Sequence, residues 1–150
     1  MPLPSEPAEP FDAKRFLDAQ ERDGTFDRAL HELDAGAKRT HWMWFVFPQL
    51  RGLGTSPSAA QFALASLGHA VAYLDHPVLG ERLRRATATV LLGPADDADD
   101  LLGAVDALKL RSSMTLFARA APAEGRFTRV LDRFYDGVPD PRTVELLTAG

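Results

Sequence analysis

The fold class is decided by residues 125–137, GRFTRVLDRFYDG. The apolar side chains in this stretch recur at Phe127, Val130, Leu131 and Phe134, which is the i, i+3, i+4, i+7 spacing of one helical face. Charged and polar residues occupy most positions between them, and the closing glycine is placed to end the helix. The stretch therefore predicts an amphipathic α-helix that buries one face against the rest of the protein.

Helical signals continue on both sides of this stretch. Ser56-Pro57 and Asp140-Pro141 each place a capping side chain before a proline, which predicts a helix start at each pair. Asp106 is predicted to cap a long helix that carries Leu110, Met114 and Phe117 on one face. Because no alternating strand pattern of useful length appears, we expect an all-α fold, a compact single-domain bundle of about seven or eight short helices.

The domain organisation follows from composition. Residues 1–10 are rich in Pro and Glu and read as a flexible N-terminal lead-in, so residues 11–150 are predicted to form the single helical domain. No apolar run reaches the roughly 18 residues that a membrane span needs, and no signal peptide is recognised at the N-terminus. Zero Cys fits a reducing compartment, so we expect a cytoplasmic protein.

Charge and metal-ligand spacing restrict the possible partners. The net charge of −4 argues against nucleic acid, for which a basic footprint is expected. The histidines do not pair at the i, i+4 spacing of a zinc helix, so neither a metal site nor a cofactor is predicted. The pattern leaves the oligomeric state open.

Residues 38–51, KRTHWMWFVFPQLR, are the most aromatic part of the chain. The run is expected to form a short helix that Pro48 ends, and a helix apolar on all sides is usually a buried central one. The alternative is that Trp42 or Trp44 lines a pocket and stacks on a flat ligand. Polar residues frame the run and support that alternative: Lys38, Arg39 and His41 before it, Gln49 and Arg51 after it.

A second polar cluster lies at residues 106–115, DALKLRSSMT. Ser112, Ser113 and a threonine are unfavourable inside a helix, so three hydroxyls in four positions need a reason. They either permit close helix packing or bind a ligand together with Lys109 and Arg111.

Three motifs together resemble a known family. Residues 41–54 (HWMWFVFPQLRGLG), 76–80 (HPVLG) and 108–117 (LKLRSSMTLF) are similar to the bacterial family catalogued as domain of unknown function 1810. The likeness covers about residues 11–147. It implies a small cytoplasmic protein with a compact all-α fold and no established activity. The family usually reads Asp-Asp before Leu-Lys-Leu, whereas this chain has Asp106-Ala107, so a chemical role for the second acid is in doubt here.

The leading functional hypothesis is a domain that binds or hydrolyses a small anionic ligand. The ligand would be a phosphate-bearing nucleotide or an ADP-ribose-like molecule; the order of helices is also remotely similar to the NADAR family of ADP-ribose-related glycosidases, without a shared motif. The alternative is a non-catalytic protein-interaction module whose aromatic segment is purely core. The candidate residues comprise acid–base groups, a stacking ring, phosphate-binding cations and polar contacts: His41 and Asp106; Trp42 or Trp44; Arg39, Arg51, Lys109 and Arg111; Gln49, Ser112 and Ser113.

Overall fold

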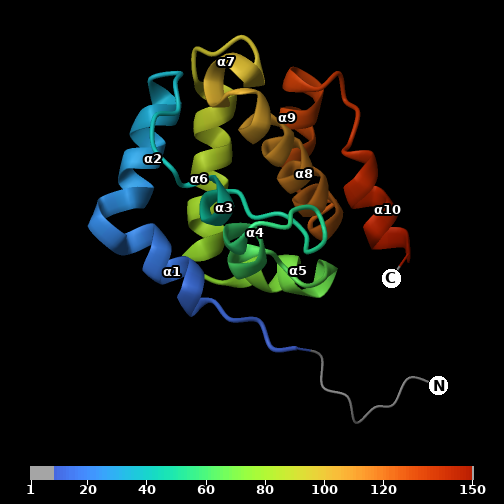
Figure 1. Cartoon of the computed structure of the whole chain (residues 1–150). Coiled ribbons are helices and arrows are strands. Elements are labelled where there is room, and N and C mark those ends of the chain that lie inside the picture. The colour runs from blue at the N-terminus through green and yellow to red at the C-terminus, as the bar shows by residue number, and fades with distance from the viewer. Residues whose placement is uncertain (1–8, 150) are drawn as a thin grey trace, which may run out of the picture.

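The computed structural model describes residues 9–149, which form an all-α fold (Figure 1). A parallel bridge joins Leu50 to Leu64, and no strand forms within the described residues. The predicted all-α fold is thus confirmed. The helices are α1 (Lys14–Glu21), η1 (Arg22–Gly24), α2 (Thr25–Asp34), α3 (Met43–Val46), α4 (Pro57–Phe62), α5 (Leu67–Asp75), α6 (Leu79–Leu92), α7 (Ala98–Leu102), α8 (Ala104–Ala120), α9 (Gly125–Phe134) and α10 (Pro141–Ala149).

The short helix α3 lies in the middle of the molecule, with α1 and α2 on one side and α8 to α10 on the other (Figure 1). Trp42, Met43, Val46 and Phe47 are buried in the single hydrophobic cluster that the helices enclose. Trp44 is only partly buried and packs at the edge of that cluster. The aromatic segment is therefore mostly the core, as its all-round apolar pattern indicates, with one indole left at the boundary.

Most of the predicted helix starts are confirmed by capping hydrogen bonds. The Ser56 hydroxyl accepts from the Ala59 amide at 3.1 Å, and the Asp140 carboxylate accepts from the Thr143 amide at 2.9 Å. The predicted cap at Asp106 is wrong. The long helix α8 begins two residues earlier, at Ala104, because Gly103 adopts a left-handed backbone with φ of 85° and turns the chain directly from α7 into α8.

Two further predictions concern the N-terminal lead-in and membrane-spanning helices. Of the lead-in predicted at residues 1–10, all but Glu9 and Pro10 lie outside the described residues. Within the described part of the chain, no helix is long and apolar enough to cross a bilayer.

Candidate functional site

A cluster of three charges joins the loop before α3 to the first turns of α8. The ammonium of Lys38 lies 2.8 Å from one oxygen of Asp106, and the ammonium of Lys109 lies 2.9 Å from the other. The three side chains are largely buried, with exposed fractions of 9% for Lys38, 17% for Asp106 and 19% for Lys109. Two cations thus share one carboxylate, and the cluster carries a net positive charge.

Each lysine of the cluster also contacts a tryptophan ring. The Lys109 ammonium lies 4.0 Å from the centre of the Trp44 ring, and the Lys38 ammonium lies 5.2 Å from that of Trp42. Burial alone would raise the pKa of Asp106, but the hydrogen bonds from Lys38 and Lys109 outweigh it and lower that pKa. Asp106 is therefore a carboxylate at neutral pH.

Glu32, which the sequence did not single out, holds the loop that carries Lys38. Its carboxylate accepts from the amides of Arg39 and Thr40, at 2.7 and 3.0 Å, from the Thr40 hydroxyl at 2.6 Å, and from the Trp42 indole at 2.9 Å. Burial raises the pKa of Glu32, but these bonds together lower it to about 2. The available signal was a charged residue three positions after Ala29 and next to Leu33, on the buried face of α2.

Four of the predicted ligand-binding residues line one open groove of about 310 Å³ beside this cluster. They are Trp44, Gln49, Lys109 and Ser112, which come from α3, the loop after it, and α8. The rest of the lining includes apolar residues and the start of α10: Leu53, Gly54, Val105, Leu108, Asp140 and Arg142. The tertiary structure thus brings the two motifs, which are far apart in the sequence, to one groove.

Asp140 also lines the groove, although it was predicted only as a helix cap. One of its oxygens accepts from the Ser112 hydroxyl at 3.1 Å and from the Thr143 amide and hydroxyl, at 2.9 and 2.5 Å. The Thr115 hydroxyl accepts from the Asp140 amide at 2.9 Å. Two of the three hydroxyls in the second motif therefore tie α8 to the start of α10, so the packing explanation accounts for them.

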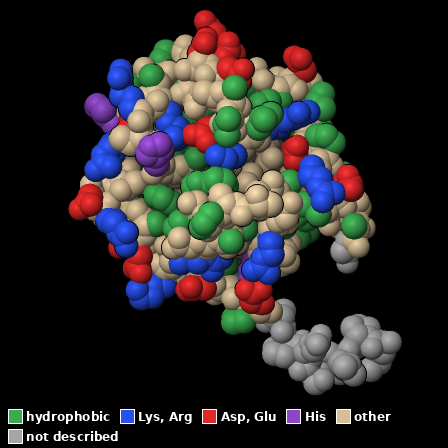
Figure 2. Space-filling model, viewed as in Figure 1, with side chains coloured by type: hydrophobic (Ala, Val, Ile, Leu, Met, Phe, Trp, Pro, Cys, Tyr) green, Lys and Arg blue, Asp and Glu red, His purple; other side chains and the backbone are tan. Residues whose placement is uncertain are grey.

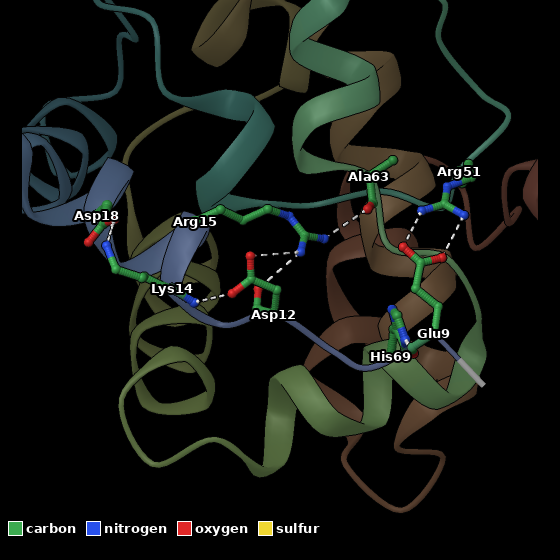
Figure 3. Close-up of polar contacts among 8 residues, drawn as sticks. All are labelled: Glu9, Asp12, Lys14, Arg15, Asp18, Arg51, Ala63 and His69. Carbon is green, nitrogen blue, oxygen red and sulfur yellow. Dashed lines mark hydrogen bonds and ion pairs between the residues drawn. The ribbon is translucent and has the colours of Figure 1, made fainter. Parts of the chain in front are cut away.

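Arg51 is engaged elsewhere, as Figure 3 shows. Its guanidinium donates to both carboxylate oxygens of Glu9, at 3.0 and 3.1 Å. The backbone carbonyl oxygen of Glu9 is hydrogen-bonded to Nε2 of His69. Arg51 lines hollows beside α4 and α5 rather than the groove. In the same view Arg15 donates to the carbonyl of Ala63 at 3.2 Å, so this region fastens α1 and residues 9–12 to the body of the protein.

The remaining candidates do not line the groove either. Trp42 and Ser113 are completely buried, and Arg111 donates to the carbonyl of Val138 at 2.9 Å. Arg39 and His41 are exposed on the loop before α3. Of the polar residues that frame the aromatic segment, Gln49 therefore lines the groove, whereas Arg39, His41 and Arg51 do not.

The family's second acid position corresponds to residue 107 of this chain, and the structure shows where it lies. Ala107 is buried, and the Tyr135 hydroxyl donates to its carbonyl. The side chain at position 107 therefore faces the core, and the alanine removes no group from the lining of the groove.

A larger hollow of about 670 Å³ lies between α6 and α9 and contains none of the predicted residues. Its acid, Glu124, is already bound by Arg84 at 2.7 Å and by Arg126 at 3.2 Å. Among residues 9–149, no group of three or more His, Asp or Glu side chains is placed to hold a metal ion. On the face in Figure 2, basic and acidic side chains are intermixed, without a large area of one sign. The groove at Trp44 remains the candidate site.

Comparisons with known proteins identify the family. A family model described as protein of unknown function (DUF1810) matches residues 10–147. A crystal structure of the conserved hypothetical protein Rv1873 from Mycobacterium tuberculosis is similar to this chain, with 49% sequence identity and a TM-score of 0.89. That similarity covers 93% of this chain and 99% of the other. No match is found among curated proteins. The chain therefore belongs to the DUF1810 family, as the three sequence motifs indicated.

Proposed function

We propose that the protein is a cytoplasmic binding protein for a small anionic ligand that carries a flat ring, namely a phosphate-bearing nucleotide or an ADP-ribose-like molecule. The observation that supports this most is the pairing of the Lys109 ammonium with the Trp44 indole in one groove, 4.0 Å apart. A cation and an aromatic face are the two groups that such a ligand needs, one for its phosphate and one for its ring.

The charge of the cluster favours an anion. Lys38 and Lys109 share the single carboxylate of Asp106, so one positive charge of this largely buried group is unbalanced by its own members. A partly buried cation is stabilised by an anionic partner. Lys109, which lines the groove, is the member that a ligand phosphate would meet.

The ring of the ligand would take the place that the Lys109 ammonium holds over the indole. The lysine side chain is long and flexible, so its ammonium can turn from the ring of Trp44 to the phosphate while its stem stays in the groove. Binding thus replaces a cation–π contact with an ion pair and a stacked pair of rings.

We propose that the protein binds this ligand and does not hydrolyse it. Asp106 has a lowered pKa and gives an oxygen to each of two ammonium groups, which makes it a poor base and a poorer acid. The other acid–base candidate, His41, is exposed and does not line the groove.

A thermal-shift and calorimetric titration with ADP-ribose and AMP tests this. We expect both to raise the melting temperature, because a ligand that binds the folded state stabilises it. Lys109→Met keeps most of the apolar stem and removes the charge, so it should weaken binding at least tenfold. Arg119→Met is the matched control, since it removes an exposed cation from the same helix, outside the groove. Millimolar ligand without a shift, or full affinity in Lys109→Met, would disprove the proposal.

The rival function, a protein-interaction module, has one specific observation in its favour. Val105 and Leu108 line the rim of the same groove with exposed fractions of 68% and 64%. Wild type itself separates the two functions. Under the ligand proposal it binds AMP and ADP-ribose with an affinity that depends on Lys109, whereas an interaction module would bind neither.

A further inference from the structure

Gln49 is a buried amide without a protein partner. Its exposed fraction is 8%, yet within the described part of the chain its side chain makes no hydrogen bond to the protein. Its backbone carbonyl, by contrast, accepts from the Leu64 amide at 2.9 Å and fixes the residue in place. The amide atoms of Gln49 are not among the fully buried side-chain atoms that lack a partner, so they stay accessible from the groove, with donors and acceptor free for a ligand.

The amide faces the groove. Gln49 lines both the groove at Trp44 and a hollow of about 250 Å³ beside α4. A β-carbon placed on Gly54 would lie 3.8 Å from the Gln49 amide nitrogen and 3.8 Å from Cη2 of Trp44, so amide and indole converge at Gly54. The same β-carbon would come within 2.8 Å of that of Ala59, so no larger residue fits there unless its surroundings shift.

We infer that Gln49 is a specificity-determining residue, and that it pairs with the edge of the ring that stacks on Trp44. This inference rests on the proposed function. A primary amide offers donors beside an acceptor, so it pairs with a ring that carries a donor next to an acceptor on one edge. Adenine has such an edge, formed by its amino group and the adjacent ring nitrogen, and glutamine is a suitable bidentate partner for it. The ligand class is thus a nucleotide whose ring has a donor next to an acceptor on one edge, and adenine is the member tested, rather than any phosphorylated ring.

The test compares AMP with purine riboside 5′-monophosphate, which lacks the amino group and is otherwise the same. A site built to hydrogen-bond a group rejects an analogue without it, because its own polar atoms stay unpaired. We expect wild type to prefer AMP at least tenfold in calorimetric titrations. Gln49→Met, which keeps the length of the side chain and removes the amide, should bind both ligands equally. Gln61→Met, an exposed glutamine on α4, is the control and should keep the preference.

The outcomes separate this inference from the function on which it rests. Wild type that binds both nucleotides with equal, Lys109-dependent affinity would overturn the role of Gln49 and leave the proposed function standing. A preference that survives in Gln49→Met would overturn it as well. If neither nucleotide binds wild type, the proposed function fails and this inference with it. The wild-type comparison needs no variant, so equal affinities for the two nucleotides overturn the inference even if Gln49→Met does not fold.

Discussion

At the scale of single residues, the hydroxyl of Ser113 is completely buried in α8 and has no hydrogen-bond partner in the part of the chain that the structure describes. A buried polar group without a partner keeps its desolvation penalty, and serine is also a poorer helix former than alanine. Ser113→Ala should therefore raise the free energy of unfolding by about 1 kcal/mol in urea denaturation. Ser112→Ala is the control and should lower it, because that hydroxyl has partners in Leu108 and Asp140. Destabilisation by Ser113→Ala would contradict this account.

Glu32 gives a residue-scale prediction about pH. Its pKa is about 2 in the folded protein, against an ordinary value of 4.5, so its stabilising contribution is present above about pH 4.5 and is lost as the pH falls toward 2. Glu32→Gln should lower the free energy of unfolding by about 2 kcal/mol at pH 7, since it weakens charge-assisted hydrogen bonds. It should also flatten the loss of stability at acidic pH. Denaturant titrations from pH 7 to pH 2 measure both effects. Glu145→Gln, at an exposed position on α10, should change neither, and an unchanged acid limb in Glu32→Gln would refute the role given to Glu32.

At the scale of elements, Gly80 sets how closely α6 approaches the end of α5. A β-carbon on Gly80 would lie 2.0 Å from the carbonyl oxygen of Leu74, so the two helix ends would have to move apart. Gly80→Ala should lower the free energy of unfolding by about 3 kcal/mol. Gly125→Ala, in the first turn of α9, meets only the flexible end of Arg129 at 3.7 Å and should be neutral or stabilising by about 0.5 kcal/mol. Equal effects of the two substitutions on the urea midpoint would show that the close approach is not what matters.

At the scale of the whole molecule, one hydrophobic cluster draws on nearly every helix. Both tryptophans lie at the central helix α3: Trp42 belongs to the cluster, and Trp44 packs at its edge. A single core predicts cooperative, two-state unfolding. The midpoint from tryptophan fluorescence, which reports the surroundings of α3, should then coincide in urea with the midpoint from far-UV circular dichroism, which reports all helices. Two separated transitions would show that the helices form more than one cooperative unit.

The helices were predictable because their signals are local. Ser56 caps α4 and Asp140 caps α10, as expected, since a cap needs only the side chain and the backbone amides that follow it. The start of α8 was not predictable from Asp106, because the turn at Gly103 joins two helices that a periodicity argument does not separate. The candidate site could be predicted only in part. Residue types suited to a ligand were visible in both motifs, but not which of them would share a groove.

The sequence by itself determined the all-α class and, through its motifs, membership of the DUF1810 family. These depend on periodicity, caps and residue identity, which are local properties of the chain. Only the tertiary structure decided that Trp44 rather than Trp42 reaches the groove, that Lys109 rather than Arg51 stands beside it, and that Gln49 keeps a free amide. The physical reason is that side-chain partners such as Asp106 for Lys38, or Glu9 for Arg51, are chosen by packing between segments far apart in the sequence.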